Sequence, residues 1–278
     1  MPYIILIICL VIALALQFLT GNFPVEIMAF PLNVICMLLW AGLMSLVWIN
    51  CRKSMFVRFM ISRGATLSSI LLLALFCLVI GITGKRHLAE SWVSVFLILY
   101  FLTVLMFVIM SRWRSKTATG ARLGAVRWRF LLIHSGLFIA LASAFFGASD
   151  KETLRLQASR NIPVRQAFRA DGTSEWLSYE LILNEFRTEK YSNGAPSSYE
   201  GILTVNGKDV DLRVNRPYSL AFGEELYLVS GSTDGNTCIL QIVREPWKYV
   251  TSAGIFILLA GAFLLFAGGP RKRYADDM

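Results

Sequence analysis

Charged side chains are scarce in this sequence, and their scarcity excludes an ordinary soluble domain for most of the chain. Only 16% of the 278 residues are charged and 56% are hydrophobic, whereas soluble globular domains carry roughly 25% charged residues. The mean hydropathy is +0.59. The missing charge is concentrated in long uncharged stretches, which predicts helices that cross a membrane.

Cysteine pairs and enzyme motifs are missing as well. The five cysteines form no CxxC, and most lie in apolar runs, which argues against a dithiol redox site and a cysteine zinc site. There is no GxSxG, no HExxH, no Walker sequence and no glycine-rich loop between a strand and a helix. We therefore expect the chain to be non-catalytic on its own.

Acidic residues are absent from the two most basic segments, residues 51–63 and 111–129, and the tail 269–278 is basic as well. The formal net charge of +9 would suit nucleic acid, but basic blocks between uncharged runs instead set membrane orientation and meet anionic lipid headgroups. Membrane lipid is therefore an expected partner, and nucleic acid is not.

About six uncharged runs are present, each with roughly the 20 residues that cross a hydrocarbon core of about 30 Å. They cover residues 2–20, 30–50, 66–84, 91–110, 130–148 and 249–268. The first run lacks the basic start and the cleavage site of a signal peptide, so it is interpreted as a retained helix. The predicted fold class is a polytopic α-helical membrane protein with an inserted extracytoplasmic β-rich domain.

The basic blocks predict the orientation of these helices. With both termini in the cytoplasm, all three blocks face the cytoplasm, and only Lys85 and Arg86 count weakly against this arrangement. The chain is thus expected to be a multi-pass protein of the inner (cytoplasmic) membrane. The expected parts are 1–65 (two N-terminal helices and a loop), 66–148 (three helices), 149–248 (the extracytoplasmic, periplasmic domain) and 249–278 (the last helix and a basic tail).

The second half of the region 149–248 is predicted to be β structure. Residues 176–186 alternate between apolar and polar, and Asn206-Gly207 joins two apolar strands with the signal of a type I′ turn. Two further strands are expected at 226–229 and 239–243, which together suggest a small β-sandwich or an open barrel. Residues 150–175 are ambiguous, and 152–159 within them can be interpreted as the start of a short helix.

The sequence holds two histidines, His87 and His134. His134 lies in the fifth apolar run, about 8 Å inside its cytoplasmic edge at 1.5 Å per residue, where an ionisable side chain is costly and usually functional. Phe130, Leu131, Leu137 and Phe138 share its helix face by spacing. This environment suits an axial haem ligand as well as it suits a histidine bonded to a neighbouring helix.

His87 lies in a short outer loop and is interpreted mainly as a solvated histidine, with contact to a haem propionate as the alternative. The two histidines are expected near opposite membrane faces, about 20 Å apart. They cannot both bind one iron, so a bis-histidine haem at His134 would need a second chain.

Residues from about 62 to 270 resemble the ResB (CcsB) family. The likeness is carried by 67–84, by 130–137 with His134 in place, by the strand pair at 179–186 and 199–203, by 212–217, 222–223 and 226–230, and by 245–249 leading into Gly254. The chain departs from the family in two extra N-terminal helices and a short outer domain.

The resemblance implies a haem-handling or scaffold subunit of a complex that exports haem and attaches it to c-type cytochromes. It implies that His134 is an axial ligand of haem b, held as a transient substrate, and that the partners are a CcsA/ResC-like polytopic membrane protein and apocytochrome c. The sequence lacks the WWD motif of that partner, so the chain is expected to contribute to a haem lyase (synthase) only as a subunit.

Two other functions remain open from the residues alone. The chain could be a structural scaffold that stabilises a polytopic partner without binding haem, with His134 as a packing residue. It could also be an extracytoplasmic sensor or ligand-binding protein, although its short cytoplasmic loops offer no output domain.

Overall fold

The structure is a computed structural model of the chain and describes residues 2–114, 121–190, 192, 196–232 and 234–268. Its contacts divide the chain into two compact units. The helical unit comprises Met1–Ser149 and Tyr249–Met278, and the β unit comprises Asp150–Lys248. Lys116 and the basic residues of the tail, which enter the orientation prediction, lie outside the described residues.

Seven α-helices are found in the described part of the chain, and six of them are long and apolar enough to cross a membrane. They are α1 (Pro2–Thr20), α2 (Leu32–Asn50), the short α3 (Met55–Met60), α4 (Arg63–Thr83), α5 (Trp92–Arg114), α6 (Ala121–Phe146) and α7 (Lys248–Ala267), with the 3-10 helices η1 (Val25–Met28), η2 (Arg86–Glu90) and η3 (Ala148–Asp150) between them. The predicted set of about six apolar helices is confirmed. Both α5 and α6 extend past their apolar runs into the basic segment between them.

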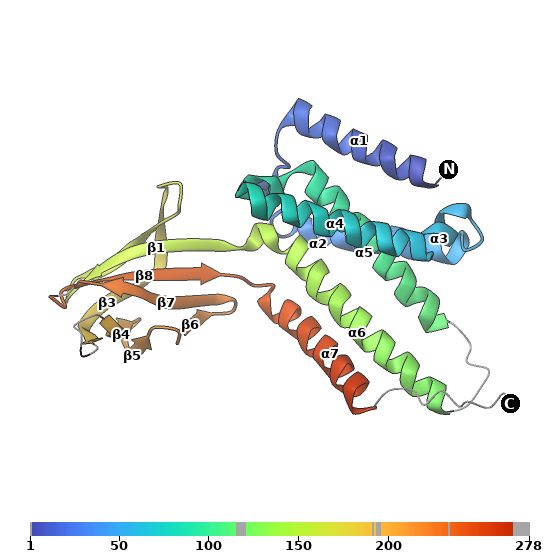
Figure 1. The fold of residues 1–278 in the computed structure, drawn as a ribbon. Helices are drawn as coiled ribbons and strands as arrows, with labels where there is room; N and C mark the ends of the chain where they lie inside the picture. Colours follow the sequence, from blue (N-terminus) through green and yellow to red (C-terminus); the bar gives the residue numbers. More distant parts are fainter. Residues whose placement is uncertain (1, 115–120, 191, 193–195, 233, 269–278) are drawn as a thin grey trace. The chain divides into compact units, whose positions relative to one another are not determined.

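Helix α5 lies at the centre of the helical unit and is the most buried of the six long helices (Figure 1). Phe107 of α5 is fully buried in a cluster with Trp48 of α2 and Val57 of α3. Leu102, also fully buried, packs on the other side against Phe146 of α6. Helices α1, α4 and α6 therefore share α5 as a common packing partner.

The first helix is tied to the start of α5 by hydrogen bonds. The Trp92 backbone N–H donates to Gln17 Oε1 at 3.0 Å, and the Trp92 indole N–H donates to Thr20 Oγ1 at 3.0 Å. Gln17 therefore satisfies a backbone donor that the first turn of α5 would otherwise leave without a partner.

Glycines bring α6 and α7 into backbone contact. A Cβ added at Gly136 of α6 would lie 2.4 Å from the Leu258 nitrogen, and one added at Gly254 of α7 would lie 2.5 Å from the Ala140 nitrogen. Small residues allow two helix backbones to approach each other this closely. Gly261 of α7 packs in the same way, because its Cβ would meet Ile133 of α6 at 2.8 Å.

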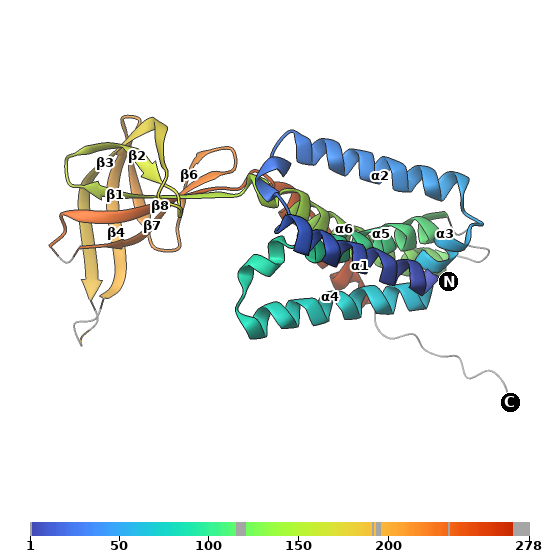
Figure 2. The same cartoon turned by 90° about the horizontal axis from the view of Figure 1, so that it is seen from above.

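The β unit is one eight-stranded antiparallel sheet in the order β5-β4-β3-β2-β1-β8-β7-β6 (Figure 2). The strands are β1 (Glu152–Ser159), β2 (Pro163–Phe168), β3 (Ser174–Lys190), β4 (Pro196–Val205), β5 (Lys208–Arg213), β6 (Tyr218–Ala221), β7 (Glu224–Gly231) and β8 (Thr237–Arg244). The sheet curls until β4 and β5 approach β7. A single curled sheet agrees with the open-barrel alternative rather than with two stacked sheets.

Two local predictions in the β unit have opposite outcomes. The Asn206-Gly207 turn is confirmed, with φ of 47° and 78° at its two residues, as a type I′ turn requires. The helix at Glu152–Ser159 is wrong, because this segment is β1 and pairs along its whole length with β8. Its inward residues Leu154, Leu156 and Ala158 have a period of two, which the strong helix propensities of Leu, Arg, Gln and Ala disguise.

An ion-pair network joins the end of β8 to the neighbouring strands. Arg244 of β8 donates to Glu152 of β1 at 2.8 Å and to Glu224 of β7 at 2.9 Å, and it also contacts Glu175 of β3. Arg169 contacts both Glu152 and Glu175. Burial alone would raise the pKa of Glu152, but the hydrogen bonds from Arg244 and Arg169 outweigh it and hold this pKa below its ordinary value.

The glycine contact between α6 and α7 predicts that Gly254→Ala destabilises the helical unit. Overpacking of a closely packed contact costs about 1–3 kcal/mol, because backbone atoms of α6 cannot move aside. Gly42→Ala in α2 is the matched control, since a Cβ there meets nothing within 4 Å. Thermal unfolding of both variants in detergent should show a lower midpoint for Gly254→Ala alone; equal midpoints would contradict this packing.

The Arg244 network predicts that the β unit loses stability in acid. The pKa of Glu152 is lower in the folded than in the unfolded chain, so its stabilisation is present above the ordinary value of 4.5 and disappears as the pH falls through the folded value. The protection of the β1 and β8 amides against hydrogen exchange, after correction for the intrinsic exchange rate at each pH, should fall below about pH 4.5. The variant Glu152→Gln should show a flatter pH dependence, and superimposable profiles would refute the assignment.

Candidate functional site

His134 lies in the middle of α6, twelve residues before the helix ends at Phe146. The helix is closed at this end by the Gly147 N–H, which donates to the Ser143 carbonyl oxygen at 2.9 Å. At 1.5 Å per residue the imidazole is about 18 Å from that end. The ring is partly buried and therefore keeps an accessible side.

The imidazole is held by the preceding turn of its own helix. Its Nδ1 lies 2.8 Å from the carbonyl oxygen of Phe130, and its ring stacks on the Phe130 ring with centroids 3.8 Å apart and planes at 21°. A carbonyl oxygen can only accept a hydrogen bond, so Nδ1 carries the proton and donates. In the neutral ring Nε2 then holds the lone pair, and this tautomer can bind a metal.

Arg112 of α5 extends the stack on the other helix. Its guanidinium carbon is 5.6 Å from the centroid of the Phe130 ring, within the range of a cation–π contact. Arg112, Phe130 and His134 thus form a series in which a positive charge lies one aromatic ring away from the imidazole. The sequence placed Arg112 only in a basic block, and no local pattern could reveal the contact, because it depends on how α5 packs against α6.

Two other residues expected on the helix face of His134 have different surroundings. Phe138 stacks on Trp40 of α2, with centroids 6.2 Å apart, and Leu131 is buried in the packed interior. Of the two phenylalanines, the structure therefore brings only Phe130 into ring contact with His134.

His134 points away from the face of α6 that packs on α7. Gly136 marks the packed face, and two residues along an α-helix rotate the side-chain direction by about 200°. The accessible side of the imidazole is therefore not covered by α7.

His87 does not belong to this site. It lies in η2, just before α5 starts at Trp92, whereas the Arg112 contact places Phe130 beside the other end of α5. The length of α5 between Trp92 and Arg112 is about 30 Å. The two imidazoles cannot reach one metal ion.

Other ligand sets are not found in the described residues. They contain no group of three or more His, Cys, Asp or Glu side chains that could hold a metal ion. All five cysteines are free. Cys238 is buried in the β unit, and this burial raises the pKa of its thiol to about 12, so it stays protonated and unreactive.

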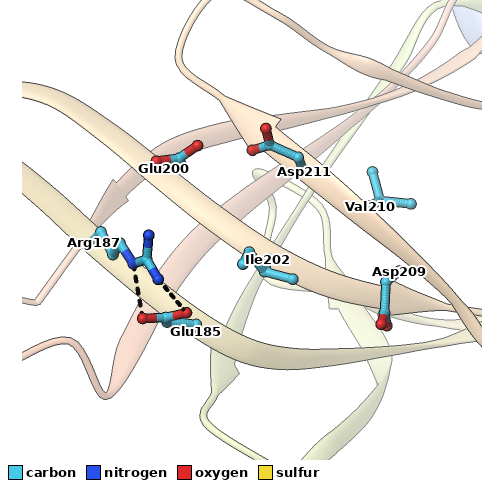
Figure 3. A pocket seen from close by; sticks show the side chains of 7 residues that line it. All are labelled: Glu185, Arg187, Glu200, Ile202, Asp209, Val210 and Asp211. Atoms are coloured by element: carbon cyan, nitrogen blue, oxygen red, sulfur yellow. Dashed lines mark hydrogen bonds and ion pairs between the residues drawn. The ribbon is translucent and has the colours of Figure 1, made fainter.

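An acidic hollow of about 290 Å³ lies on β3, β4 and β5 (Figure 3). Its carboxylates already have partners: Glu185 accepts two hydrogen bonds from Arg187, at 2.8 and 2.9 Å, and Asp209 accepts one from Thr204 at 2.6 Å. The hydrogen bonds from Arg187 lower the pKa of Glu185. Glu200 and Asp211 pair with Arg213, so the carboxylates of this hollow are bonded to neighbouring side chains of the sheet.

The arrangement defines a class of protein: a bundle of long apolar helices with one partly buried histidine and a curled β unit between its last two long helices. The model of the ResB-like family matches residues 111–239, from the end of α5 to the start of β8. This segment of the chain is thus ResB-like, and His134 lies inside it.

Two further comparisons add little. A solved structure titled cytochrome c heme lyase CcmF aligns with 72% of this chain and 34% of that chain, at a TM-score of 0.40 and 14% identity. This chain spans about a third of that one, and such a score does not establish a common fold. The comparison with curated proteins gives no match.

The Phe130 contact predicts the tautomer of His134. In the His87→Gln variant His134 is the remaining histidine, so its ring nitrogens can be observed by nitrogen-15 NMR of the protein in lipid. At a pH where the ring is neutral, we expect a proton on Nδ1 and a lone pair on Nε2. A proton on Nε2 would contradict the geometry.

Proposed function

We propose that the chain is a membrane subunit of the machinery that matures c-type cytochromes, and that it holds haem through His134. The observation that carries the proposal is the ligand-competent Nε2 of a partly buried imidazole within the ResB-like segment. The role in cytochrome c biogenesis, export of haem and its attachment, follows from the family resemblance.

The residues around His134 fit a haem. Nε2 supplies a neutral nitrogen donor of the kind that binds haem iron axially, and Phe130 fixes the ring by stacking and by accepting the Nδ1 proton. Arg112 places a guanidinium near the ring, where it could pair with a propionate carboxylate. The haem itself would be the cargo, and its iron would supply the site for two axial ligands.

A second histidine ligand must come from another polypeptide. His87 is too distant, and the uncovered side of His134 faces away from α7. We therefore infer that a CcsA/ResC-like polytopic partner donates it across this face of α6. Holding the haem between two chains would position it for transfer by proximity alone, while the thiols of apocytochrome c would provide the bond-forming groups.

The membrane arrangement belongs to the same proposal. The six long helices would cross the cytoplasmic membrane with both termini in the cytoplasm, and the β unit would lie outside. From there its curled sheet would bind the partner or the apocytochrome. The chain would supply no catalytic side chain of its own.

One observation favours a scaffold without haem. The Nδ1 hydrogen bond and the ring stacking of His134 are satisfied within its own helix, as they would be for a packing residue. Loss of the partner upon deletion of this chain, together with normal cytochrome maturation in His134→Ala, would establish that role instead.

Purification of the chain with its polytopic partner tests haem binding. We expect copurified b-type haem with a low-spin bis-histidine spectrum, and we expect His134→Ala to lose most of it, because Nε2 is one of the two ligands. His87→Ala is the control that should keep it. In His134→Gly, added imidazole should restore the spectrum, which separates a ligand role from a packing role; full haem occupancy in His134→Ala would refute the proposal.

A further inference from the structure

An apolar cavity of about 290 Å³ lies inside the helical unit, away from His134. Its walls come from α1, α2, α3 and α5, and they include Ile5, Cys9, Met44, Phe59, Phe96 and Tyr100. The cavity is partly open, because its lining residues Ile5, Met55 and Phe56 are 56%, 60% and 38% exposed, and the last two belong to α3. It is bounded largely by the N-terminal helices that precede the ResB-like match.

The lining decides which chemistry can enter. No charged side chain borders the cavity. The few polar groups are already bonded: Thr103 donates to the Leu99 carbonyl oxygen at 2.7 Å, and the Tyr100 hydroxyl lies 2.9 Å from Ser68 Oγ. An ionised or strongly polar occupant would therefore be desolvated without compensation. The cavity is also far too small for a whole helix, which is about 10 Å across.

Basic residues lie in and directly beside α3, which lines the exposed side of the cavity. Arg52 and Lys53 directly precede α3, Arg58 lies within it, and Arg63 begins α4. All four are exposed, none takes part in an ion pair between described residues, and residues 51–63 contain no acid. Arg52 packs over the Trp48 ring at 4.9 Å, a contact that leaves its charge available.

The combination of an uncharged cavity and a basic opening matches a lipid with an anionic headgroup. We propose that the helical unit holds one anionic phospholipid, with part of an acyl chain in the cavity and the phosphate against the basic residues around α3. The inference rests on the proposed insertion of the helical unit into a membrane, where such residues face the anionic leaflet. The lipid would fill the space between α1 and α5 and so fix the N-terminal helices against the rest of the unit.

Native mass spectrometry of the full chain, delipidated in mild detergent, tests this site. After incubation with dioleoylphosphatidylglycerol or dioleoylphosphatidylcholine, we expect one phosphatidylglycerol per chain and at least tenfold less retained phosphatidylcholine. Arg58→Gln should lower phosphatidylglycerol retention about fivefold, the factor expected for one basic residue at an anionic surface. Lys85→Gln, beyond the opposite end of α4, is the matched control and should leave retention unchanged. Equal retention of both lipids, or equal loss in both variants, would overturn the proposal.

The size of the cavity is tested separately from the charge. Cys9→Phe should abolish phosphatidylglycerol retention because the phenylalanine ring occupies the cavity. Cys9→Ala is the control for the position and should retain the lipid. Inorganic phosphate should not displace phosphatidylglycerol; displacement would mean a headgroup site without an acyl chain. Because lipid retention is read without haem, His134→Ala should leave it intact, so failure here and failure of the haem proposal are distinguishable.

Discussion

The hydrogen bond from His134 Nδ1 to the Phe130 carbonyl oxygen determines which imidazole nitrogen can meet a metal. Stacking on Phe130 fixes the plane of the ring, and the cation of Arg112 lies on the same aromatic group. One nitrogen donor is then available from this chain, on a helix face that α7 does not cover. A haem with two histidine ligands therefore requires a second polypeptide, which is why the proposed function is that of a subunit.

The close approach of α6 and α7 explains how a large β unit can be inserted in a helical protein. Gly136 and Gly254 allow the two backbones to touch, which holds together the helices on either side of the insertion. Within the β unit, the first and last strands are also neighbours, because β1 pairs with β8 from Glu152–Arg244 to Ser159–Thr237. In each unit, the two elements at the junctions with the other unit are therefore held together by contacts within their own unit.

The sequence predicted most of the elements but little of the packing. Uncharged runs located the six long helices. They could not show that α5 and α6 continue through Arg112 and Trp128, because hydropathy reports how apolar a segment is and not where its helix ends. The turn at Asn206-Gly207 was readable because positive φ has a strong residue preference. The spacing of Phe130 and His134 predicted their shared face. The Arg112 contact and the cavity beside α3 were not predictable, since both depend on how separate helices pack.

The number of nitrogen ligands that each chain gives to the iron tests the central claim most directly. A complex assembled from the nitrogen-15-histidine-labelled chain and its unlabelled polytopic partner can be studied in the ferric state by electron–nuclear double resonance. The proposed site predicts one nitrogen-15 and one nitrogen-14 axial imidazole on each iron. Two ligands of the same isotope, whether from this chain or from the partner, would contradict it.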